Sequence, residues 1–473
     1  MSEARVAEPA WRLWIASALG LWAAAVALAP DLKSAALLSL PLLVVALGWW
    51  TILAPARWVT LFFATALLLP PLPVRLGDTG PHVAVAVAAL GLFAGLLRLP
   101  EWRIRADGLT RALLVYFFVL LASVSLAAFY SGPVIAAGTL ARVLLFGIAV
   151  YLFFYTAYGP GAREGSDPSR TARALFWIAA ASALFACLDF YFQFPAPAGF
   201  GPQFVWLDSG VYRRAQGLFY EASTLGNFCV FFLVMIAAAL SRPPRESPVS
   251  RAGLLTGGAI FSAALVFSYS RASLLNLIAA SLALLFLHRR RLRLRRLAAA
   301  LLIAIGAGVA LGYAFFPAFV RLYWLNVQRS VQYFFSATEG VLSGRLESWR
   351  TLGQFLAENP WHALAGIGYK TLPYTSFAGH PVIADNMYLS MLVETGLIGL
   401  AALIALNLGI LWAARRAARS PRASFFGTWI FCFWIGQLFQ MLSGDLLTYW
   451  RVLPVYFWVL AVAVRESTQA PAS

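Results

Sequence analysis

Charged residues are scarce in this sequence. Only 12% of its 473 residues are Asp, Glu, Lys or Arg, and lysine occurs just twice, against 61% hydrophobic residues. The mean hydropathy is +0.76. A water-exposed surface normally carries about a quarter charged residues, so these values exclude a soluble globular domain. The lipid bilayer must be the solvent for most of the chain.

Cysteine and histidine are also rare, with three and four copies. Cys187, Cys229 and Cys432 all fall inside apolar stretches, and no metal-ligand spacing relates them. We interpret them as small core residues. The sequence therefore indicates neither a disulfide nor a zinc site, and we expect no metal and no cofactor.

Long apolar runs dominate what is present. In hydrocarbon every backbone amide must be satisfied within the protein, which leaves helices or a closed barrel, and the runs here are too long for barrel strands. We predict an all-α, polytopic helical membrane bundle with about fourteen transmembrane helices. The predicted spans are 11–29, 35–53, 58–72, 82–97, 109–130, 134–158, 172–194, 218–240, 253–269, 273–287, 297–319, 386–413, 424–442 and 446–464.

Arginine clusters occupy every second loop along the chain, most densely in 288–296. Short cytoplasmic loops retain Lys and Arg, so these loops and both termini are predicted to be cytoplasmic. The loops 195–217 and 320–385 then lie outside, within a single integral membrane domain. No cleavable signal peptide is apparent, because the first apolar run lacks a small-residue cleavage site. The net charge of +17 follows from this topology and from anionic lipid headgroups, so we do not expect nucleic-acid binding.

Arginines on the predicted outer side need another explanation, because topology predicts few of them there. Arg142 sits within a predicted helix, Arg214 ends the shorter outer loop, Arg271 caps a helix hairpin, and Arg345 lies in the long loop. A guanidinium is always charged and suits bidentate phosphate contacts, so several converging on one cavity would neutralise a pyrophosphate. The alternatives are a solvated surface charge for a loop arginine, and for Arg142 a structural salt bridge to Asp189 or Glu394.

The long outer loop also contains a helical pattern. Leu346, Trp349, Leu352, Phe355 and Leu356 recur at three- and four-residue spacing, which predicts an amphipathic helix on the membrane face that ends at 359–360. The segment after it is rich in Gly and Pro, and we expect an irregular lid there.

Several short motifs share their order, spacing and sidedness with a known family. They are Gln216-Gly-Leu-Phe with Leu225-Gly-Asn, Ser268-Tyr-Ser-Arg271-Ala-Ser, Ser343-Gly-Arg345 with Trp349, Asn359-Pro-Trp-His-Ala-Leu-Ala-Gly-Ile-Gly368, and Asp385-Asn-Met-Tyr-Leu with Glu394-Thr-Gly. In these motifs the chain, from 216 to about 400, resembles the bacterial O-antigen ligase and Wzy-type polysaccharide polymerase superfamily.

The resemblance implies a metal-independent, inverting glycosyltransferase of the polytopic GT-C type. It would act on the periplasmic face of the bacterial inner membrane, with an undecaprenyl-diphosphate-linked glycan as donor and a glycan acceptor. Arginines would stabilise the departing lipid diphosphate, and Arg142, Arg214, Arg271 and Arg345 are the candidates. Membrane lipid and a chain-length regulator are further candidate partners.

One position departs from the family pattern. In the motif Asp385-Asn-Met-Tyr-Leu the chain is predicted to enter the membrane again after the long outer loop. Ligases of this family usually carry a His directly before this Asn, whereas this chain has Asp385, with His380 five residues earlier. Asp385 or His380 is therefore the candidate general base, although Asp385 could instead cap the following helix and His380 could be an ordinary loop residue. Because polymerases tolerate variation here, we favour a polymerase over a ligase.

Three further residues complete the predicted diphosphate and glycan contacts: Lys370, Tyr388 and Glu394. Glu394 falls in mid-helix and is interpreted as a buried partner of an arginine. A lipid-linked oligosaccharide flippase or other transporter is the alternative from a different class, but the chain shows no internal repeat and its polar residues gather at one face. A cell-elongation type peptidoglycan polymerase is a further enzyme alternative, without a recognisable catalytic Asp motif in the loop.

Overall fold

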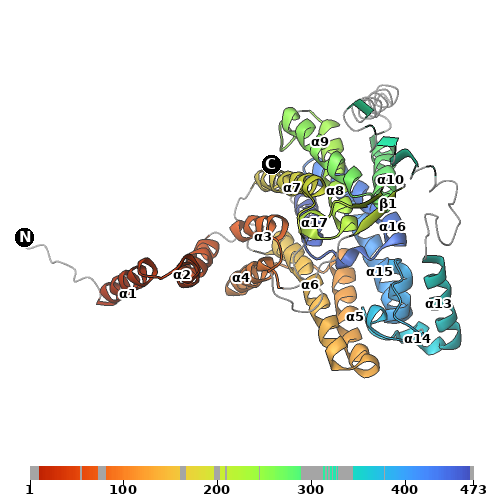
Figure 1. The fold of residues 1–473 in the computed structure, drawn as a ribbon, viewed down its shortest axis with the longest axis horizontal. Helices are drawn as coiled ribbons and strands as arrows, with labels where there is room; N and C mark the ends of the chain where they lie inside the picture. The colour runs from red at the N-terminus through yellow and green to blue at the C-terminus, as the bar shows by residue number, and fades with distance from the viewer. Residues whose placement is uncertain are drawn as a thin grey trace, which may run out of the picture.

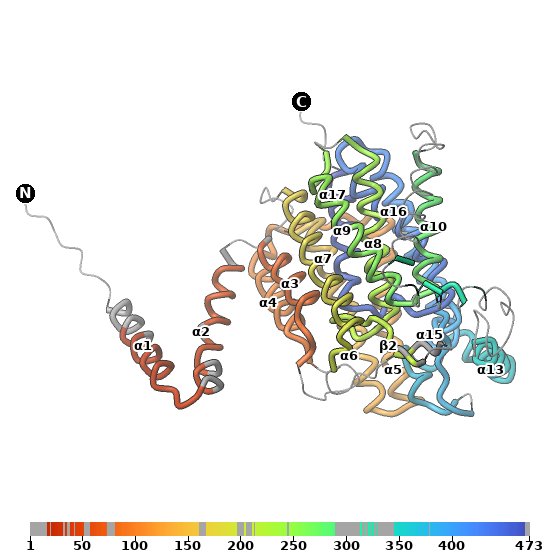
Figure 2. The backbone as a smooth tube through the Cα atoms, turned by 45° about the horizontal axis from the view of Figure 1, so that its top comes forward, coloured from red at the N-terminus to blue at the C-terminus, as the bar shows by residue number. Residues whose placement is uncertain are grey.

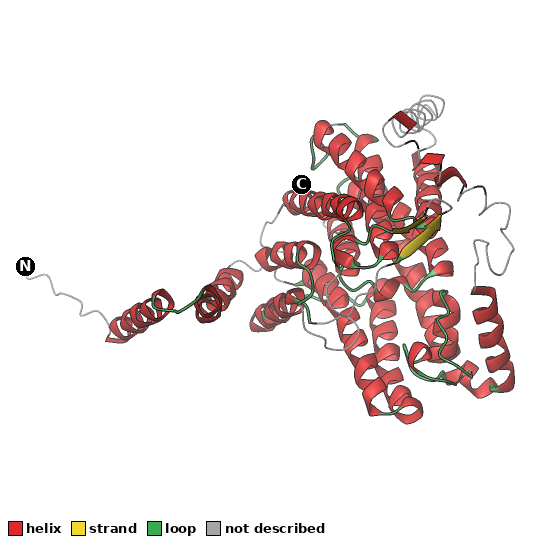
Figure 3. Ribbon diagram, viewed as in Figure 1, coloured by secondary structure: helices red, strands yellow, loops and turns green. Residues whose placement is uncertain are grey.

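The computed structural model describes residues 10–53, 56–72, 81–159, 167–195, 203–207, 210–243, 246–288, 345–377 and 379–468, with isolated positions between 313 and 328. These residues are helical apart from turns and one short hairpin (Figure 3). An all-helical class is thus confirmed for the described residues, and the hairpin corrects it in one place. Its strands are β1 (Phe204–Leu207) and β2 (Gly210–Arg213), which pair antiparallel.

The helices coincide with most of the predicted apolar segments. Those of the first half are α1 (Ala10–Ala27), α2 (Leu32–Leu53), α3 (Ala56–Leu68), α4 (Val83–Leu97), α5 (Gly108–Ser131), α6 (Pro133–Tyr158) and α7 (Pro168–Phe192). Those of the second half are α8 (Ala222–Leu240), α9 (Arg251–Phe267), α10 (Arg271–His288), α13 (Arg345–Glu358), α14 (Pro360–Ala365), α15 (Met387–Arg419), α16 (Ser424–Gln440) and α17 (Leu453–Thr468). The predicted span 297–319 lies almost wholly outside the described residues.

Seven of the described helices are long and apolar enough to cross a membrane: α5, α6, α7, α8, α10, α15 and α16. Four shorter apolar helical stretches fall within α2, α3, α4 and α9. The chain is therefore a multi-helix membrane protein, while the count of about fourteen spans stays a prediction.

Local sequence signals set the helix ends. The Asp107 carboxylate accepts a hydrogen bond from the Thr110 amide at 2.8 Å and so caps α5. Gly132, at φ 85°, and Pro133 then turn the chain from α5 into α6. Asn386 caps α15 by accepting from the amides of Tyr388 and Leu389. The capping role considered for Asp385 therefore belongs to its neighbour.

The core of the bundle is formed by α8, α16 and α17, which are buried along most of their length. Helices α5, α6, α7, α9, α10 and α15 surround them, while α1 and α2 extend away from the body as an arm (Figure 1). Aromatic side chains fill this core: the Phe231 ring lies within 4.8 Å of the rings of Trp429, Phe433 and Tyr456. Helices buried on all sides explain why the apolar runs show no polar face.

Unequal helix lengths create the setting for the site. The helices α8, α9, α10, α16 and α17 have 16 to 19 residues, and α5 and α6 have 24 and 26. At 1.5 Å per residue the second pair is longer by roughly 10 Å. The α5 and α6 hairpin therefore projects beyond the ends of the shorter helices, and the chain between α13 and α15 packs beside it (Figure 2).

The predicted amphipathic helix is α13, which ends at Glu358 just before Asn359 and Pro360. Its apolar side packs against protein, because Leu352 and Phe355 are buried in a small cluster with Ile367, Leu372, Val382, Ala384 and Val393. The span predicted over 386–413 is broken in its third turn. Gly396 has φ 70° and ψ −172°, so two helical pieces meet at an angle within α15.

Candidate functional site

The β hairpin brings Arg214 to the turn between α9 and α10. The Arg214 amide donates to the Gln203 carbonyl at 2.8 Å, and its Nε donates to the Ser268 carbonyl at 2.8 Å. Arg213 turns the other way and is buried, where it pairs with the Asp189 carboxylate and donates to the Phe194 carbonyl. Asp189 is thus the partner of Arg213 rather than of Arg142.

The motif at 268–273 forms this turn and positions Arg271 at the start of α10. Tyr269 has a left-handed backbone with φ 50°. The hydroxyls of Ser270 and Ser273 lie 2.8 Å apart and face Gly226 of α8, where an added Cβ would come within 2.6 Å of Ser273 Oγ. The serines therefore serve close packing of the two helices, and that packing fixes the point from which Arg271 leaves the turn.

Arg345 reaches the same region from the first turn of α13. Its Nε lies 3.4 Å from Asp385 Oδ2, and one turn later Trp349 Nε1 donates to the Ala384 carbonyl at 2.7 Å. Asp385 itself has φ 44°, a conformation that costs a non-glycine residue free energy. Two contacts from α13 thus hold Ala384 and Asp385, immediately before α15.

The three arginines form one electrostatic cluster. The pKa of Arg214 is lowered, first by burial and then by the nearby charges of Arg271 and Arg345, against the opposing charge of Glu221. Arg271 and Arg345 also repel each other directly. Like charges brought together by separate chain segments are unfavourable without an anion. The cluster Arg214, Arg271 and Arg345, called the arginine cluster below, is therefore suited to a polyanionic ligand.

A carboxylate borders this cluster. Glu221 precedes α8 but does not cap it, because the Gln203 side chain accepts from the Ala222 amide at 3.0 Å. The Glu221 carboxylate accepts instead from the Thr224 hydroxyl at 2.6 Å and is hydrogen-bonded to Tyr449. Burial raises the pKa of Glu221, partly offset by that Thr224 bond and by the charge of Lys370.

A second group of charges lies on the other side of Asp385. Lys370 Nζ lies 2.5 Å from Asp445 Oδ2, and both side chains are nearly buried. Burial alone would lower the pKa of Lys370, but the carboxylates of Asp445 and Glu394 outweigh it and raise the pKa. Glu394 Oε1 accepts from the Leu372 amide at 3.3 Å. The expected arginine partner of Glu394 is therefore replaced by backbone amide and lysine.

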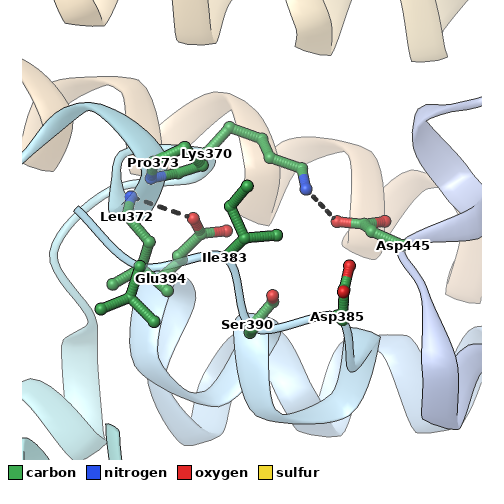
Figure 4. Close-up of a pocket in the computed structure, with 10 residues that line it drawn as sticks. Lys370, Leu372, Pro373, Ile383, Asp385, Ser390, Glu394 and Asp445 are labelled. Carbon is green, nitrogen blue, oxygen red and sulfur yellow. Dashed lines mark hydrogen bonds and ion pairs between the residues drawn. The ribbon is translucent and has the colours of Figure 1, made fainter. Parts of the chain in front are cut away.

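These residues enclose a cavity of about 50 Å³, lined by Lys370, Leu372, Pro373, Val382, Ile383, Ala384, Asp385, Ser390, Glu394 and Asp445. Figure 4 shows the lysine spanning one side toward Asp445, with Glu394 at one end and the Asp385 carboxylate at the other. A volume of this size holds a few waters or hydroxyl groups and not a whole sugar ring.

The remaining predicted site residues lie around this centre. Arg142 donates to the Tyr374 hydroxyl at 2.8 Å and lies over its ring, so it binds the irregular segment before Asp385. Tyr388 is half-buried and donates to the Leu438 carbonyl at 3.2 Å. His380 is exposed, just after Gly379, and is not among the residues that line the cavity.

Sequence reasoning missed three polar residues of the site: Glu221, Asp445 and Tyr449. The signal for Asp445 was available, since an acidic residue between two apolar helices on the predicted outer side is as unusual as an arginine there. Glu221 lies between the motifs Gln216-Gly-Leu-Phe and Leu225-Gly-Asn, and no spacing relates it to Asp385. Tyr449 fell inside the predicted span 446–464, which the structure shortens to a helix beginning at Leu453.

The comparisons with known proteins bear on the same segment. No curated protein matches the sequence. A family model described as O-antigen ligase matches residues 256–404, a range that includes Arg271, Arg345, Lys370, Asp385 and Glu394. The motifs that resemble this family thus fall within the matched range from Ser268 onward. Residues 256–404 are therefore similar to the O-antigen ligase family.

Proposed function

We propose that this protein is a periplasmic-face glycosyltransferase of the bacterial inner membrane, with both termini cytoplasmic, that polymerises undecaprenyl-diphosphate-linked oligosaccharide repeat units. The observation that carries the proposal is the arginine cluster, which joins three separate chain segments beside a carboxylate and a polar cavity. A lipid diphosphate is the polyanion that this family's reaction releases, and arginines bind such groups in bidentate fashion.

The proposed reaction uses this arrangement. An acceptor hydroxyl attacks the anomeric carbon of the donor sugar with inversion, and the bond from that carbon to the diphosphate oxygen breaks. The arginine cluster stabilises the negative charge that develops on the leaving diphosphate, where preorganised cations have their largest effect. The Asp385 carboxylate, which is 47% exposed beside Arg345, accepts the proton of the acceptor hydroxyl. No metal ion enters this scheme.

A ligase that transfers the glycan to lipid A core or to another acceptor is the second candidate. The description of the matching family favours it, and the chemistry at the anomeric carbon would be the same. Asp385 favours the polymerase, because ligases usually carry a His at this position.

The test is glycan analysis of cells that carry Arg271→Ala, Asp385→Ala or His380→Ala, with membrane levels of each variant confirmed. We expect Arg271→Ala and Asp385→Ala to abolish long-chain polysaccharide and to leave single lipid-linked repeat units on the periplasmic side. His380→Ala distinguishes the two candidate bases. Arg111→Ala is the matched control, since Arg111 is an exposed arginine at the opposite end of α5.

Three other outcomes are informative. Polymer that is made but stays on its lipid carrier would favour the ligase. Repeat units that stay on the cytoplasmic side would favour the transporter alternative. Normal polysaccharide from Arg271→Ala would contradict the glycosyltransferase proposal itself.

A further inference from the structure

The cavity beside Asp385 has a closed end and an open end. At the closed end Glu394 is 1% exposed. The Asp385 side chain, at 47% exposure, forms the open end next to Arg345 of the arginine cluster. Ser390, on the same face of α15 as Glu394, adds a hydroxyl to the wall. A group that enters past Asp385 thus leaves the cationic region and meets the hydroxyl of Ser390 and the carboxyl group of Glu394.

One atom in the closed end lacks a hydrogen-bond partner. Glu394 Oε1 accepts from the Leu372 amide, but among the described residues nothing pairs with the buried Oε2. Leaving a buried acceptor unpaired is costly. The Lys370 ammonium is already held by Asp445 at 2.5 Å. A ligand that donates a hydrogen bond would satisfy the unpaired oxygen.

The lining of the cavity carries more carboxyl groups than cations. Asp385, Glu394 and Asp445 line it together with Lys370, which pairs with Asp445, while Asp385 pairs with Arg345 from outside the lining. A diphosphate is attracted to the arginines and repelled from this cavity, and a sugar carboxylate would be repelled as well. Hydroxyl or ammonium groups of a sugar match the carboxyl lining.

We propose that this cavity is the acceptor subsite, and that it takes the hydroxyl-bearing edge of a neutral or amino sugar and rejects a sugar carboxylate. The inference rests on the proposed function, because only a glycosyltransferase needs an acceptor sugar beside the donor. It adds the position of the acceptor and its chemical class. Glu394 is the residue that binds the sugar edge, and the Lys370 pair is a positioning element that holds the wall.

The test uses the full-length protein in lipid nanodiscs and three soluble probes: methyl glucoside, methyl glucosaminide and methyl glucuronide. Binding is measured by saturation-transfer NMR. We expect the neutral and amino glycosides to bind and the glucuronide to bind severalfold more weakly, because its carboxylate would lie against the carboxyl groups of the lining. Glu394→Gln should bring the glucuronide to within about threefold of the glucoside.

Controls separate this subsite from the rest of the site. Arg271→Ala should keep the discrimination between glycosides, because Arg271 belongs to the arginine cluster and not to the cavity lining. If Glu394→Gln does not fold, Ser390→Ala replaces it and should weaken methyl glucoside binding severalfold.

The inference is overturned if no glycoside binds, if the wild-type protein binds all three equally, or if both cavity variants behave as wild type. Its failure is distinct from failure of the proposed function. Suppose that discrimination between the glycosides depends on Glu394, but cells with Arg271→Ala make normal polymer. The cavity would then bind sugars, and the proposed glycosyltransferase function would be wrong.

Discussion

Removing Lys370 should destabilise the protein more than removing its partner Asp445. The two side chains are 17% and 11% exposed, and their charged atoms are 2.5 Å apart. Breaking a buried ion pair by deleting one member costs about 3–5 kcal/mol, because the other charge stays buried and unpaired. The environment of this pair makes that cost unequal for its two members.

Glu394 is the reason for the asymmetry. Its carboxylate also acts on the charge of Lys370. In Lys370→Met two buried carboxyl groups lose their only nearby ammonium, so we expect the upper end of the range, about 4–5 kcal/mol. In Asp445→Asn the ammonium still faces Glu394, and a loss of about 1–3 kcal/mol follows.

The measurement is the apparent free energy of unfolding from SDS titration in mixed micelles, for both single variants and the double variant. The double variant should lose less unfolding free energy than the two single variants together, because it leaves neither charge of the pair unpaired. Arg170→Met is the matched control. Arg170 and Asp167 are 3.9 Å apart and 86% and 51% exposed, so the change should stay within about 1 kcal/mol.

The pH dependence gives an independent check. The pKa of Lys370 is raised in the folded protein above its ordinary value of 10.5. Its contribution to stability is thus fully present at neutral pH and is lost only as the pH rises through the raised pKa. Equal losses in the two single variants would refute the role given to Glu394, and additive losses in the double variant would refute the coupling of Lys370 with Asp445.

Three further changes have definite expected outcomes. Arg214→Lys should abolish polymer in cells as Arg214→Ala does, because the three N–H groups of a lysine share one nitrogen and cannot donate to the Ser268 carbonyl while a planar fork of two other nitrogens faces a ligand; wild-type polymer levels from the lysine variant would count against a bidentate role. Gly396→Ala should sharply reduce protein in the membrane, since an added Cβ would lie 2.1 Å from the Leu364 carbonyl oxygen at φ 70°, whereas Gly353→Ala, with open space around it, should accumulate normally. At pH values above the ordinary range of carboxyl pKa values, Glu221→Gln should raise the free energy of unfolding. The raised pKa of Glu221 means that the stability contributed by its protonated form is present in acid and is lost as the pH rises. An unchanged pH profile of stability would show that Glu221 is not buried as described.

The sequence predicted the parts of the site that depend on charge in an apolar context. Arg271 and Arg345 are exceptional in a chain where topology predicts few outer charges, and the structure brings them together with Arg214. Asp385 was identified from its place in a motif. What could not be predicted is pairing at a distance, such as Lys370 with Asp445, because 75 residues separate them and no periodicity relates them.

The misinterpreted elements have local physical causes. A β hairpin was not predicted in 195–217, although aromatic and β-branched residues stand on both sides of the sequence Asp-Ser-Gly in 204–213, a pattern typical of a hairpin. A continuous span was predicted over 386–413 because a single glycine hardly changes the hydropathy of the segment. Gly396 breaks it through a backbone conformation that only glycine adopts easily.

The break at Gly396 also explains how opposite charges can share this site. Because α15 bends there, its first two turns, from Met387 to Thr395, run separately from the rest of the helix. The Glu394 carbonyl accepts from the Gly368 amide at 2.8 Å, which ties this short piece to the segment that carries Lys370. The piece therefore presents Glu394 and Ser390 to the cavity, while Asp385 at its start meets Arg345. A straight helix through 387–419 would place those residues in line with the long piece that packs on α5 and α16. The carboxyl-lined cavity and the cationic cluster thus meet along the short piece that the bend at Gly396 sets apart, and Asp385 stands at the boundary where donor and acceptor would meet.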